Sequence, residues 1–338
     1  MRHKRVIASR TGGPEVLEVV EEEIPEPASG QVRVRVLRAG VAFGDILWQS
    51  GKVPGGPKPP YTPGYDLVGI VDKLGPGVAG VELGARVAAL VRIGGYSEVA
   101  IVPSDYLHPV PADLDPSEII CLTLNYITGY QLFRRIVKMI PGNRVLIHGA
   151  AGGVGTAMLQ LGKLMDLEMY GTASAPKHEL VSSLGATPID YRNEDFVERV
   201  LDITGDGVDL VVDHIGGDHL NRSFRTLRPG GTLISTSAYA SVKGEISSFA
   251  TLLGALRMPL WNLLPNKKSA ILFDVVPFNR KNPSFFGEDL DALLGHLSRG
   301  EIDPIIATQM PLSEAKQAQE MLLAARAQGK VVLICNEQ

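Results

Sequence analysis

Alternating apolar and polar positions mark the first third of the chain as β structure. Residues 31–38 read Gln-Val-Arg-Val-Arg-Val-Leu-Arg, and this period of two is typical of a half-buried strand. Several short strands joined by glycine and proline turns predict a small, barrel-like β domain. Further strands are expected at 66–74, 86–91 and 96–102, with turns at 75–77 and 94–95.

The pattern changes near residue 115, where helices begin to alternate with strands. Asp115 followed by Pro116 is typical of a helix start, with the aspartate as N-cap. The alternation predicts an α/β fold with a parallel, doubly wound sheet. Strands are expected at 144–148, 168–172, 188–190, 208–213, 232–235, 305–309 and 331–334, and helices from the loop after 148 to about 165 and at 177–184, 193–204, 289–297 and 313–326.

Length and composition are those of a globular protein of about two domains. The 338 residues are 45% hydrophobic and 21% charged, and the net charge of −4 is spread without long runs. We therefore expect no nucleic-acid partner and no membrane attachment. The two cysteines cannot build a disulfide framework. The basic first five residues are followed by no long apolar run, so we expect no signal peptide and a cytoplasmic protein.

The strongest chemical signal is a glycine-rich segment between a strand and a helix. It reads Gly149-Ala150-Ala151-Gly152-Gly153-Val154-Gly155 and follows the apolar strand at 144–148. Small residues let the backbone approach a pyrophosphate, and the following helix offers unpaired N–H groups and a partial positive charge. We interpret residues 151–155 as a dinucleotide-binding turn, the alternative being a turn without a ligand.

The end of the next strand indicates which dinucleotide binds. NAD enzymes usually carry a carboxylate there to hold the ribose hydroxyls. Here the segment 171–178 reads Gly-Thr-Ala-Ser-Ala-Pro-Lys-His, without a carboxylate. Ser174 and Lys177 can donate to a 2′-phosphate, which favours NADPH. The alternative is that Ser174 caps a helix and Lys177 is a solvated surface residue.

Several motifs occur together along the chain, namely the turn at 149–155, Leu184-Gly185-Ala186, the segments 12–17, 63–69, 75–78 and 84–87, Asn125–Tyr130 and Gly329–Leu333. Together they resemble the quinone oxidoreductase branch of the medium-chain dehydrogenase/reductase superfamily. The resemblance implies a GroES-like β-barrel domain formed by both chain ends and a Rossmann domain between them. We expect a first catalytic part at 1–122, an NADPH-binding domain at 123–268 and a return to the catalytic domain at 269–338.

The resemblance also implies roles for single residues. Ser174, Lys177 and Tyr191 match positions that hold the 2′-phosphate, although Tyr191 is equally well an ordinary half-buried aromatic. Asn125 and Thr128 match positions near the nicotinamide and its phosphate. The remaining cofactor contacts expected from the family pattern are His214, Ile215, Ser235 within the loop 235–239, and Lys330.

Zinc ligands of the superfamily are missing from the matching positions. The segment 40–45 has no cysteine, Tyr65-Asp66 has no histidine, and the four-cysteine lobe is absent. Because a catalytic zinc needs nitrogen or sulfur ligands, we expect no metal. Without a Lewis acid, alcohol oxidation is difficult, whereas quinones and α,β-unsaturated carbonyls accept hydride readily. The expected activity is therefore NADPH-dependent reduction of a small hydrophobic quinone or enone.

Reduction of such a substrate also requires a proton donor. Asp45, Tyr61 and Tyr65 are candidates, although each also has a structural interpretation as a helix cap or packing residue. Ala42 stands where many relatives carry asparagine, and this departure puts a standard quinone or enone pocket in doubt. Trp48 could line the pocket instead, which would favour a bulky apolar substrate.

Two alternatives remain open at this point. One is an enoyl or enone reductase of a biosynthetic pathway, and the other is a catalytically weak NADPH-binding protein. The apolar segment 240–268 is interpreted as a lid, a dimer surface or part of the core. The segment 269–276 is expected to be an edge strand, which in this superfamily commonly pairs across a homodimer.

Overall fold

The computed structural model describes residues 1–52, 55–236, 239–242, 244 and 248–337 of the chain. These residues form two compact units, one of Met1–Ile127 with Asn279–Gln338 and one of Thr128–Phe278. The sequence had placed the divisions after 122 and 268. The second division comes later because the strand after 268 hydrogen-bonds to the sheet of the second unit.

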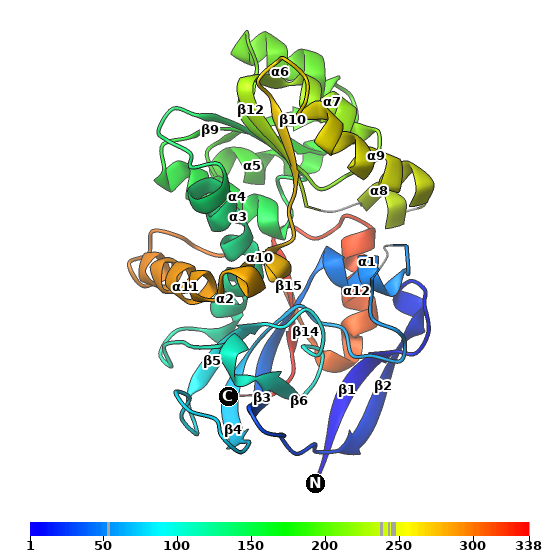
Figure 1. Cartoon of the computed structure of the whole chain (residues 1–338), viewed down its shortest axis with the longest axis vertical. Helices are drawn as coiled ribbons and strands as arrows, with labels where there is room; N and C mark the ends of the chain where they lie inside the picture. Colours follow the sequence, from blue (N-terminus) through cyan, green and yellow to red (C-terminus); the bar gives the residue numbers. More distant parts are fainter. Residues whose placement is uncertain (53–54, 237–238, 243, 245–247, 338) are drawn as a thin grey trace. The chain divides into compact units, whose positions relative to one another are not determined.

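The second unit contains a six-stranded sheet in the order β10-β9-β8-β11-β12-β13 (Figure 1). Every neighbouring pair in this sheet is parallel. The order reverses between β8 and β11, which confirms the predicted doubly wound arrangement. The strands are β8 (Arg144–His148), β9 (Glu168–Ala173), β10 (Ala186–Asp190), β11 (Val208–Asp213), β12 (Leu227–Ser235) and β13 (Ser269–Leu272).

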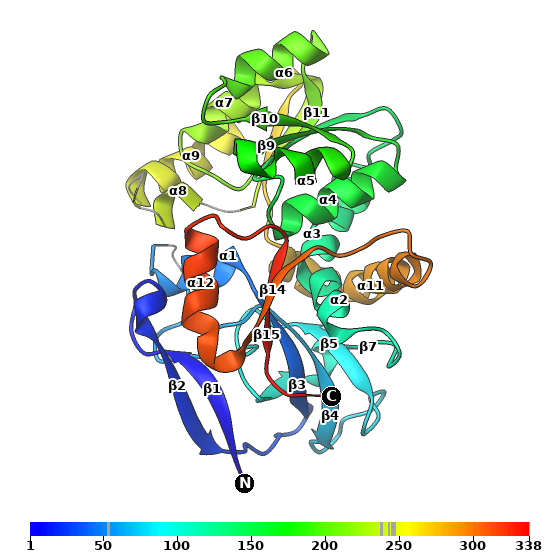
Figure 2. The same ribbon diagram turned by 180° about the vertical axis from the view of Figure 1, so that it is seen from behind.

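Helices cover both faces of this sheet, and the apolar strands are buried between them. One face carries α6, α7 and α9, whose Phe196, Phe224 and Met258 pack with Leu146 and Val211 of the strands. Figures 1 and 2 show α4 and α5 on the other face. The helices of this part are α3 (Ile127–Gln131), α4 (Gly153–Leu164), α5 (His178–Ser183), α6 (Phe196–Thr204), α7 (His219–Arg225), α8 (Tyr239–Val242), α9 (Ser248–Trp261) and α10 (Val275–Lys281).

The first unit is a mixed sheet in the order β14-β15-β3-β4-β5-β7, with β6 also paired to β3. Its core contains many valines and alanines of these strands, together with Leu67, Tyr96 and Leu333. The mixed sheet agrees with the predicted β domain. In Figure 2, α12 lies beside β14, and the two elements are in contact. The strands are β3 (Gln31–Val41), β4 (Asp66–Leu74), β5 (Arg86–Leu90), β6 (Val99–Pro103), β7 (Leu107–Pro109), β14 (Ile306–Pro311) and β15 (Lys330–Ile334), and the helices α1 (Phe43–Gln49), α2 (Pro116–Cys121), α11 (Pro283–Ser298) and α12 (Ala315–Leu323).

A two-stranded hairpin at the start of the chain was not expected from the sequence. It consists of β1 (Arg2–Ala8) and β2 (Leu17–Glu23), paired antiparallel. At the start of β1, Arg2 faces Glu23 and Lys4 faces Glu21, whereas Val6 faces Val19 further along. The charged pairs stabilise the ladder and obscure the apolar alternation by which a strand is usually detected.

The apolar segment 240–268 divides between core and surface. Met258 is buried in the core of the second unit, and Trp261 stacks on Phe224. Five leucines of the same segment are exposed, namely Leu253, Leu256, Leu260, Leu263 and Leu264. Strand β13 is an edge strand, as predicted, but it ends at Leu272 rather than at 276, because α10 begins at Val275. Residues 237 and 238 of the expected cofactor loop and the side chain of Leu252 lie outside the described part of the structure.

Among the described residues, no helix is both long enough and apolar enough to span a bilayer.

Candidate functional site

The glycine-rich turn connects the end of β8 to the start of α4. Gly149 has φ +70°, a left-handed conformation that glycine adopts without strain. Gly152 is the N-cap of α4 and is extended. The turn is tied to the sheet because Ala150 N–H donates to the Thr172 carbonyl over 3.1 Å. The predicted strand–turn–helix context of residues 151–155 is therefore present.

Two glycines of the turn have different steric environments. A Cβ on Gly155 would lie 2.5 Å from the Ala150 carbonyl oxygen, so this glycine is required for the close contact of helix and turn. A Cβ on Gly152 would meet only the Gly149 carbonyl oxygen, at 3.2 Å. In the protein without ligand, a side chain at residue 152 therefore causes less steric conflict than a side chain at residue 155.

The start of α4 has the properties of an anion site. Within the described residues, the backbone N–H groups of Gly153, Val154 and Gly155 donate to no protein acceptor. Three such groups at the positive end of a twelve-residue helix favour a phosphate. Nearby in the fold, at the end of β11, the buried Nε2 of His214 has no partner either. Both observations fit a dinucleotide.

The residues expected to hold a 2′-phosphate lie at the ends of β9 and β10. Ser174 is the N-cap of a short 3-10 turn, but its side chain makes no capping hydrogen bond. Burial, followed by the positive charge of Arg192, lowers the pKa of Lys177. Arg192 also stands over the ring of Tyr191, with 5.8 Å from its guanidinium carbon to the ring centroid. Sequence reasoning missed Arg192, although it directly follows Tyr191.

The other predicted cofactor residues are found in varied settings. Asn125 and Thr128 are 5% and 6% exposed, within a helical stretch that includes the π-helical turn Leu122–Tyr126. The backbone N–H of Ile215 donates to Asp213, and Ser235 is buried at the end of β12. Contact of these four residues with a cofactor stays a prediction.

Lys330 has a structural partner within the first unit. Its ammonium is 2.8 Å from Asp66 Oδ2, and the two side chains are 2% and 0% exposed. A Cβ on Gly40 would collide with both groups, so glycine is needed beside the pair. Burial raises the pKa of Asp66, and the charge of Lys330 opposes that shift. The cofactor role predicted for Lys330 has no support from its contacts here.

Asp45 is a buried hydrogen-bond acceptor in the first unit. Its carboxylate accepts hydrogen bonds from the N–H groups of Ala42 and Gly64 and from the Tyr96 hydroxyl, at 2.8–3.1 Å. Burial raises the pKa of Asp45 to about 7, against the lowering effect of these bonds. The predicted alternative, a helix cap, is therefore the role that its contacts show at the start of α1.

The two candidate tyrosines differ in how their hydroxyls are engaged. Tyr65 accepts a short hydrogen bond from the Trp48 indole. Tyr61 is 9% exposed, and its buried hydroxyl has no partner among the described residues. Burial, with added repulsion from Asp45 and Tyr65, raises the pKa of Tyr61. Tyr61 therefore holds a proton that no other protein group uses.

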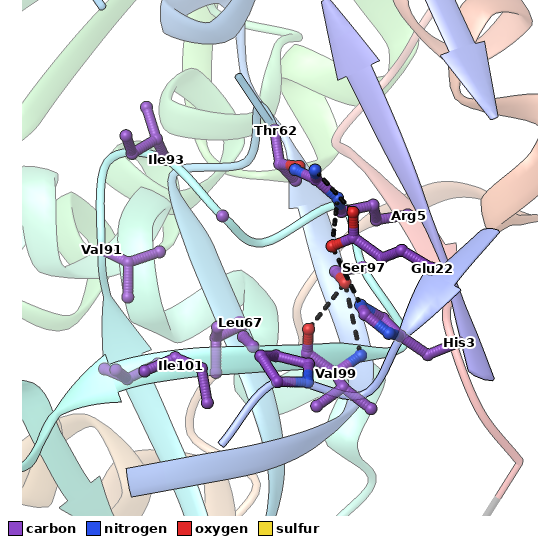
Figure 3. Close-up of a pocket in the computed structure, with 14 residues that line it drawn as sticks. His3, Arg5, Glu22, Thr62, Leu67, Val91, Ile93, Ser97, Val99 and Ile101 are labelled. Carbon is purple, nitrogen blue, oxygen red and sulfur yellow. Dashed lines mark hydrogen bonds and ion pairs between the residues drawn. The ribbon is translucent and has the colours of Figure 1, made fainter. Parts of the chain in front are cut away.

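A separate cavity of about 180 Å³ lies in the first unit. Figure 3 shows Arg5 together with Glu22 and Thr62 on one side of the cavity, and Val91 and Ile93 on the other side. Arg5 donates to Thr62 Oγ1 over 2.9 Å and to Glu22 over 2.8 Å. None of the predicted catalytic residues lines this cavity.

The parallel sheet, the glycine turn and the free N–H groups define a dinucleotide-binding oxidoreductase fold. Residues 28–112 match the family model "Alcohol dehydrogenase GroES-like domain", and residues 184–333 match "Zinc-binding dehydrogenase". The human "Synaptic vesicle membrane protein VAT-1 homolog-like" is 30% identical over 98% of this chain and 80% of its own length. This chain belongs to the medium-chain dehydrogenase/reductase superfamily, in its zinc-free quinone oxidoreductase-like branch.

Solved structures agree with this assignment. The Escherichia coli quinone oxidoreductase complexed with NADPH is 29% identical, covers 98% of this chain and 99% of its own, and has a TM-score of 0.87. The CurK enoyl reductase is 25% identical, covers 98% of this chain and 99% of its own, and has a TM-score of 0.81. At the level of the family, the expectation of NADPH as cofactor is confirmed.

The first prediction concerns the turn. Gly152→Val should reduce affinity for NADPH and NADH alike by about tenfold or more, because the branched side chain crowds the phosphates where backbone approach is needed. Valine adopts the extended backbone of residue 152 without strain, so circular dichroism and the melting temperature should change little. Cofactor affinity is measured by quenching of protein fluorescence.

Gly155→Val is the matched comparison. Its Cβ would overlap the Ala150 carbonyl, so this variant should lose stability as well as binding. Unchanged cofactor affinity in a folded Gly152→Val protein would show that the phosphates do not meet this turn.

Proposed function

We propose that this protein is an NADPH-dependent reductase of quinones or α,β-unsaturated carbonyl compounds that works without zinc. The observation that carries the proposal is the combination of unpaired N–H groups at the start of α4 with two cations, Lys177 and Arg192, near the end of β9. The first would bind the pyrophosphate and the second the 2′-phosphate of the cofactor.

The cation pair gives the preference for NADPH its physical basis. Two like charges held near each other cost free energy until an anion neutralises them. The segment from Ser174 to His178 contains no carboxylate. Asp190 contributes one negative charge near Arg192 and accepts hydrogen bonds from the Arg192 N–H and the Asn193 amide. We propose that a dianionic 2′-phosphate adds the further negative charge that favours binding beside Lys177 and Arg192.

NADPH, when bound, supplies a hydride to an electron-poor carbon of the substrate. The remaining requirement is a proton for the enolate or quinol oxygen. Asp45 is committed to three donors, and Tyr65 is engaged by Trp48. The Tyr61 hydroxyl has no competing partner, so we propose it as the proton donor of the first unit.

A second candidate function has a specific basis in the relatives. CurK is an enoyl reductase, and the VAT-1 homologue is named for a vesicle membrane rather than for a reaction. The discriminating experiment is an NADPH-oxidation screen over quinones, enones, enoyl thioesters and aldehydes. Turnover of enoyl thioesters alone would favour the biosynthetic reductase, and tight NADPH binding without any turnover would favour a binding protein.

The second prediction concerns cofactor choice. Lys177→Ala should raise the Kd for NADPH about 10- to 100-fold, because a charge-assisted hydrogen bond to the 2′-phosphate is lost. The Kd for NADH should stay within about twofold, since NADH lacks that group. Lys163→Ala, which removes an exposed lysine of α4, is the control and should change neither value. Equal losses for both cofactors would contradict the assignment of Lys177.

The third prediction concerns proton delivery. Tyr61→Phe should lower kcat about 100-fold with little change in NADPH affinity, because general acid catalysis commonly contributes a factor of this size. The variant should be at least as stable as the native protein, since the lost hydroxyl makes no hydrogen bond. Steady-state kinetics and thermal unfolding provide the two measurements.

Tyr65→Phe is the comparison, because it removes an engaged hydroxyl from a neighbouring ring. It should lower the melting temperature through loss of the Trp48 hydrogen bond. If Tyr61→Phe kept the native kcat while the solvent isotope effect remained, the proton would come from elsewhere.

The fourth prediction concerns assembly. We propose a homodimer through the edge strand β13, whose Ile271 and Leu272 are 36% and 58% exposed. Leu272→Lys would bring two charges together at a two-fold axis, and light scattering should then report a monomer. Ile93→Lys, at an exposed apolar position of the first unit, is the control and should leave the mass unchanged. A monomeric mass for the native protein would contradict the proposed homodimer.

A further inference from the structure

A buried chain of side chains connects two loops at the carboxyl end of the parallel sheet. It begins at Gly149 and passes through Thr172, His148 and Ser223 to Asp213. These four side chains are 0–3% exposed. They come from β9, β8, α7 and β11 respectively, so elements far apart in sequence contribute to one network.

The donors and acceptors fix a single direction for this chain. Gly149 N–H donates to Thr172 Oγ1 over 3.3 Å, and Ser223 Oγ–H donates to Asp213 Oδ2 over 2.6 Å. The Ser223 oxygen then accepts from His148 Nε2, at 3.0 Å. His148 Nδ1 is left with a lone pair, which accepts from the Thr172 hydroxyl at 3.1 Å. The network therefore assigns the proton of neutral His148 to Nε2.

Asp213 anchors the far end through its second oxygen. Its Oδ1 accepts from the N–H groups of Ile215 and Gly216, over 2.7 and 3.0 Å, and so shapes the turn after β11. His219 Nδ1 lies 2.8 Å from Asp213 Oδ2. Burial alone would raise the pKa of Asp213, but the hydrogen bonds from His219 and Ser223 hold it below its usual value. The ionised Asp213 carboxylate is thus the last acceptor of the hydrogen-bonded series.

The same atoms could at first suggest a metal site. One nitrogen each from His148 and His219 and an oxygen of Asp213 lie within 4.8 Å of one another. However, the Ser223 hydroxyl bridges His148 and Asp213, and a zinc ion would need the His148 Nε2 lone pair that the chain gives to a proton. The network is complete without an ion.

We propose that Asp213, Ser223, His148 and Thr172 are positioning residues that hold the pyrophosphate-binding turn and the 214–217 turn in their binding conformations as one unit. This inference rests on the proposed NADPH function, since the turn that starts at Gly149 is the one assigned to the pyrophosphate. Because the pyrophosphate is common to both cofactors, the network affects affinity for NADPH and NADH equally, unlike Lys177.

The fifth prediction uses an isosteric substitution at each end. Thr172→Val and Ser223→Ala should each raise the Kd of both cofactors about tenfold, through loss of one buried hydrogen bond and release of the turn. If the residues act as one chain, the double variant should be no worse than either single one, a non-additivity that double-mutant cycles measure. Thr226→Val is the matched control, because this buried hydroxyl donates only to the Ser223 carbonyl in its own helical turn.

A second readout does not depend on cofactor binding. Nitrogen-15 NMR of labelled histidines in the protein without cofactor should show His148 as the Nε2–H tautomer, and Thr172→Val should perturb that signal whereas Thr226→Val should not. Failure of native protein to bind NADPH would sink the proposed function while leaving this signal as expected.

Three results would overturn the positioning role. They are additive losses in the double variant, losses that Thr226→Val reproduces, and an Nδ1–H tautomer of His148. Stoichiometric binding of Zn²⁺ to the native protein that His219→Gln abolishes would also overturn it, because the ion would take the lone pair that the chain assigns to hydrogen.

Discussion

The unpaired N–H groups at the start of α4 are the constraint on which the rest of the second unit depends. A helix cannot satisfy its first donors internally, and the part of the chain that the structure describes supplies no acceptor for the N–H groups of Gly153, Val154 and Gly155. The turn before this helix consists of glycine and alanine, which leaves its backbone accessible. A diphosphate would supply the acceptors that these N–H groups lack, and we propose that Lys177 and Arg192, after the next two strands, hold a separate phosphate of the same ligand.

The first unit handles buried charge in the opposite way. Asp45 accepts three hydrogen bonds, and Asp66 forms an ion pair with the ammonium of Lys330, so each carboxylate has partners inside the protein. A buried charge without such partners would cost several kcal/mol. The catalytic role predicted for Asp45 stays a prediction. The Tyr61 hydroxyl, which lies near Asp45, is a neutral group whose burial costs less, and it has no hydrogen-bond partner among the described residues.

The sequence predicted the parallel sheet closely because its strands are continuous apolar runs between clear breakers. The strands at 144–148 and 208–213 were predicted to the residue. The β1–β2 hairpin was missed because charged pairs such as Arg2–Glu23 and Lys4–Glu21 obscure the buried positions Val6 and Ala8 in the pattern. Arg192 was missed because a cation after a strand has no distinctive pattern. The hydrogen-bonded chain from Gly149 to Asp213 could not be predicted either, since His148 sits inside an apolar strand and its partners are distant in sequence.

The location of the hydrogen-bonded series from Gly149 to Asp213 explains why polar residues are found in the core of an otherwise apolar sheet. A buried histidine, serine and threonine would each cost free energy if left unpaired, and an apolar replacement would pack as well. Each is satisfied only by the next, and the series ends on a carboxylate whose other oxygen shapes the turn after β11. An apolar core would hold the strands together equally well, but it would not fix the conformations of loops that follow two different strands. Polar atoms with defined directions can do so, and their position at the carboxyl ends of β8 and β11 is where a doubly wound sheet binds its ligand.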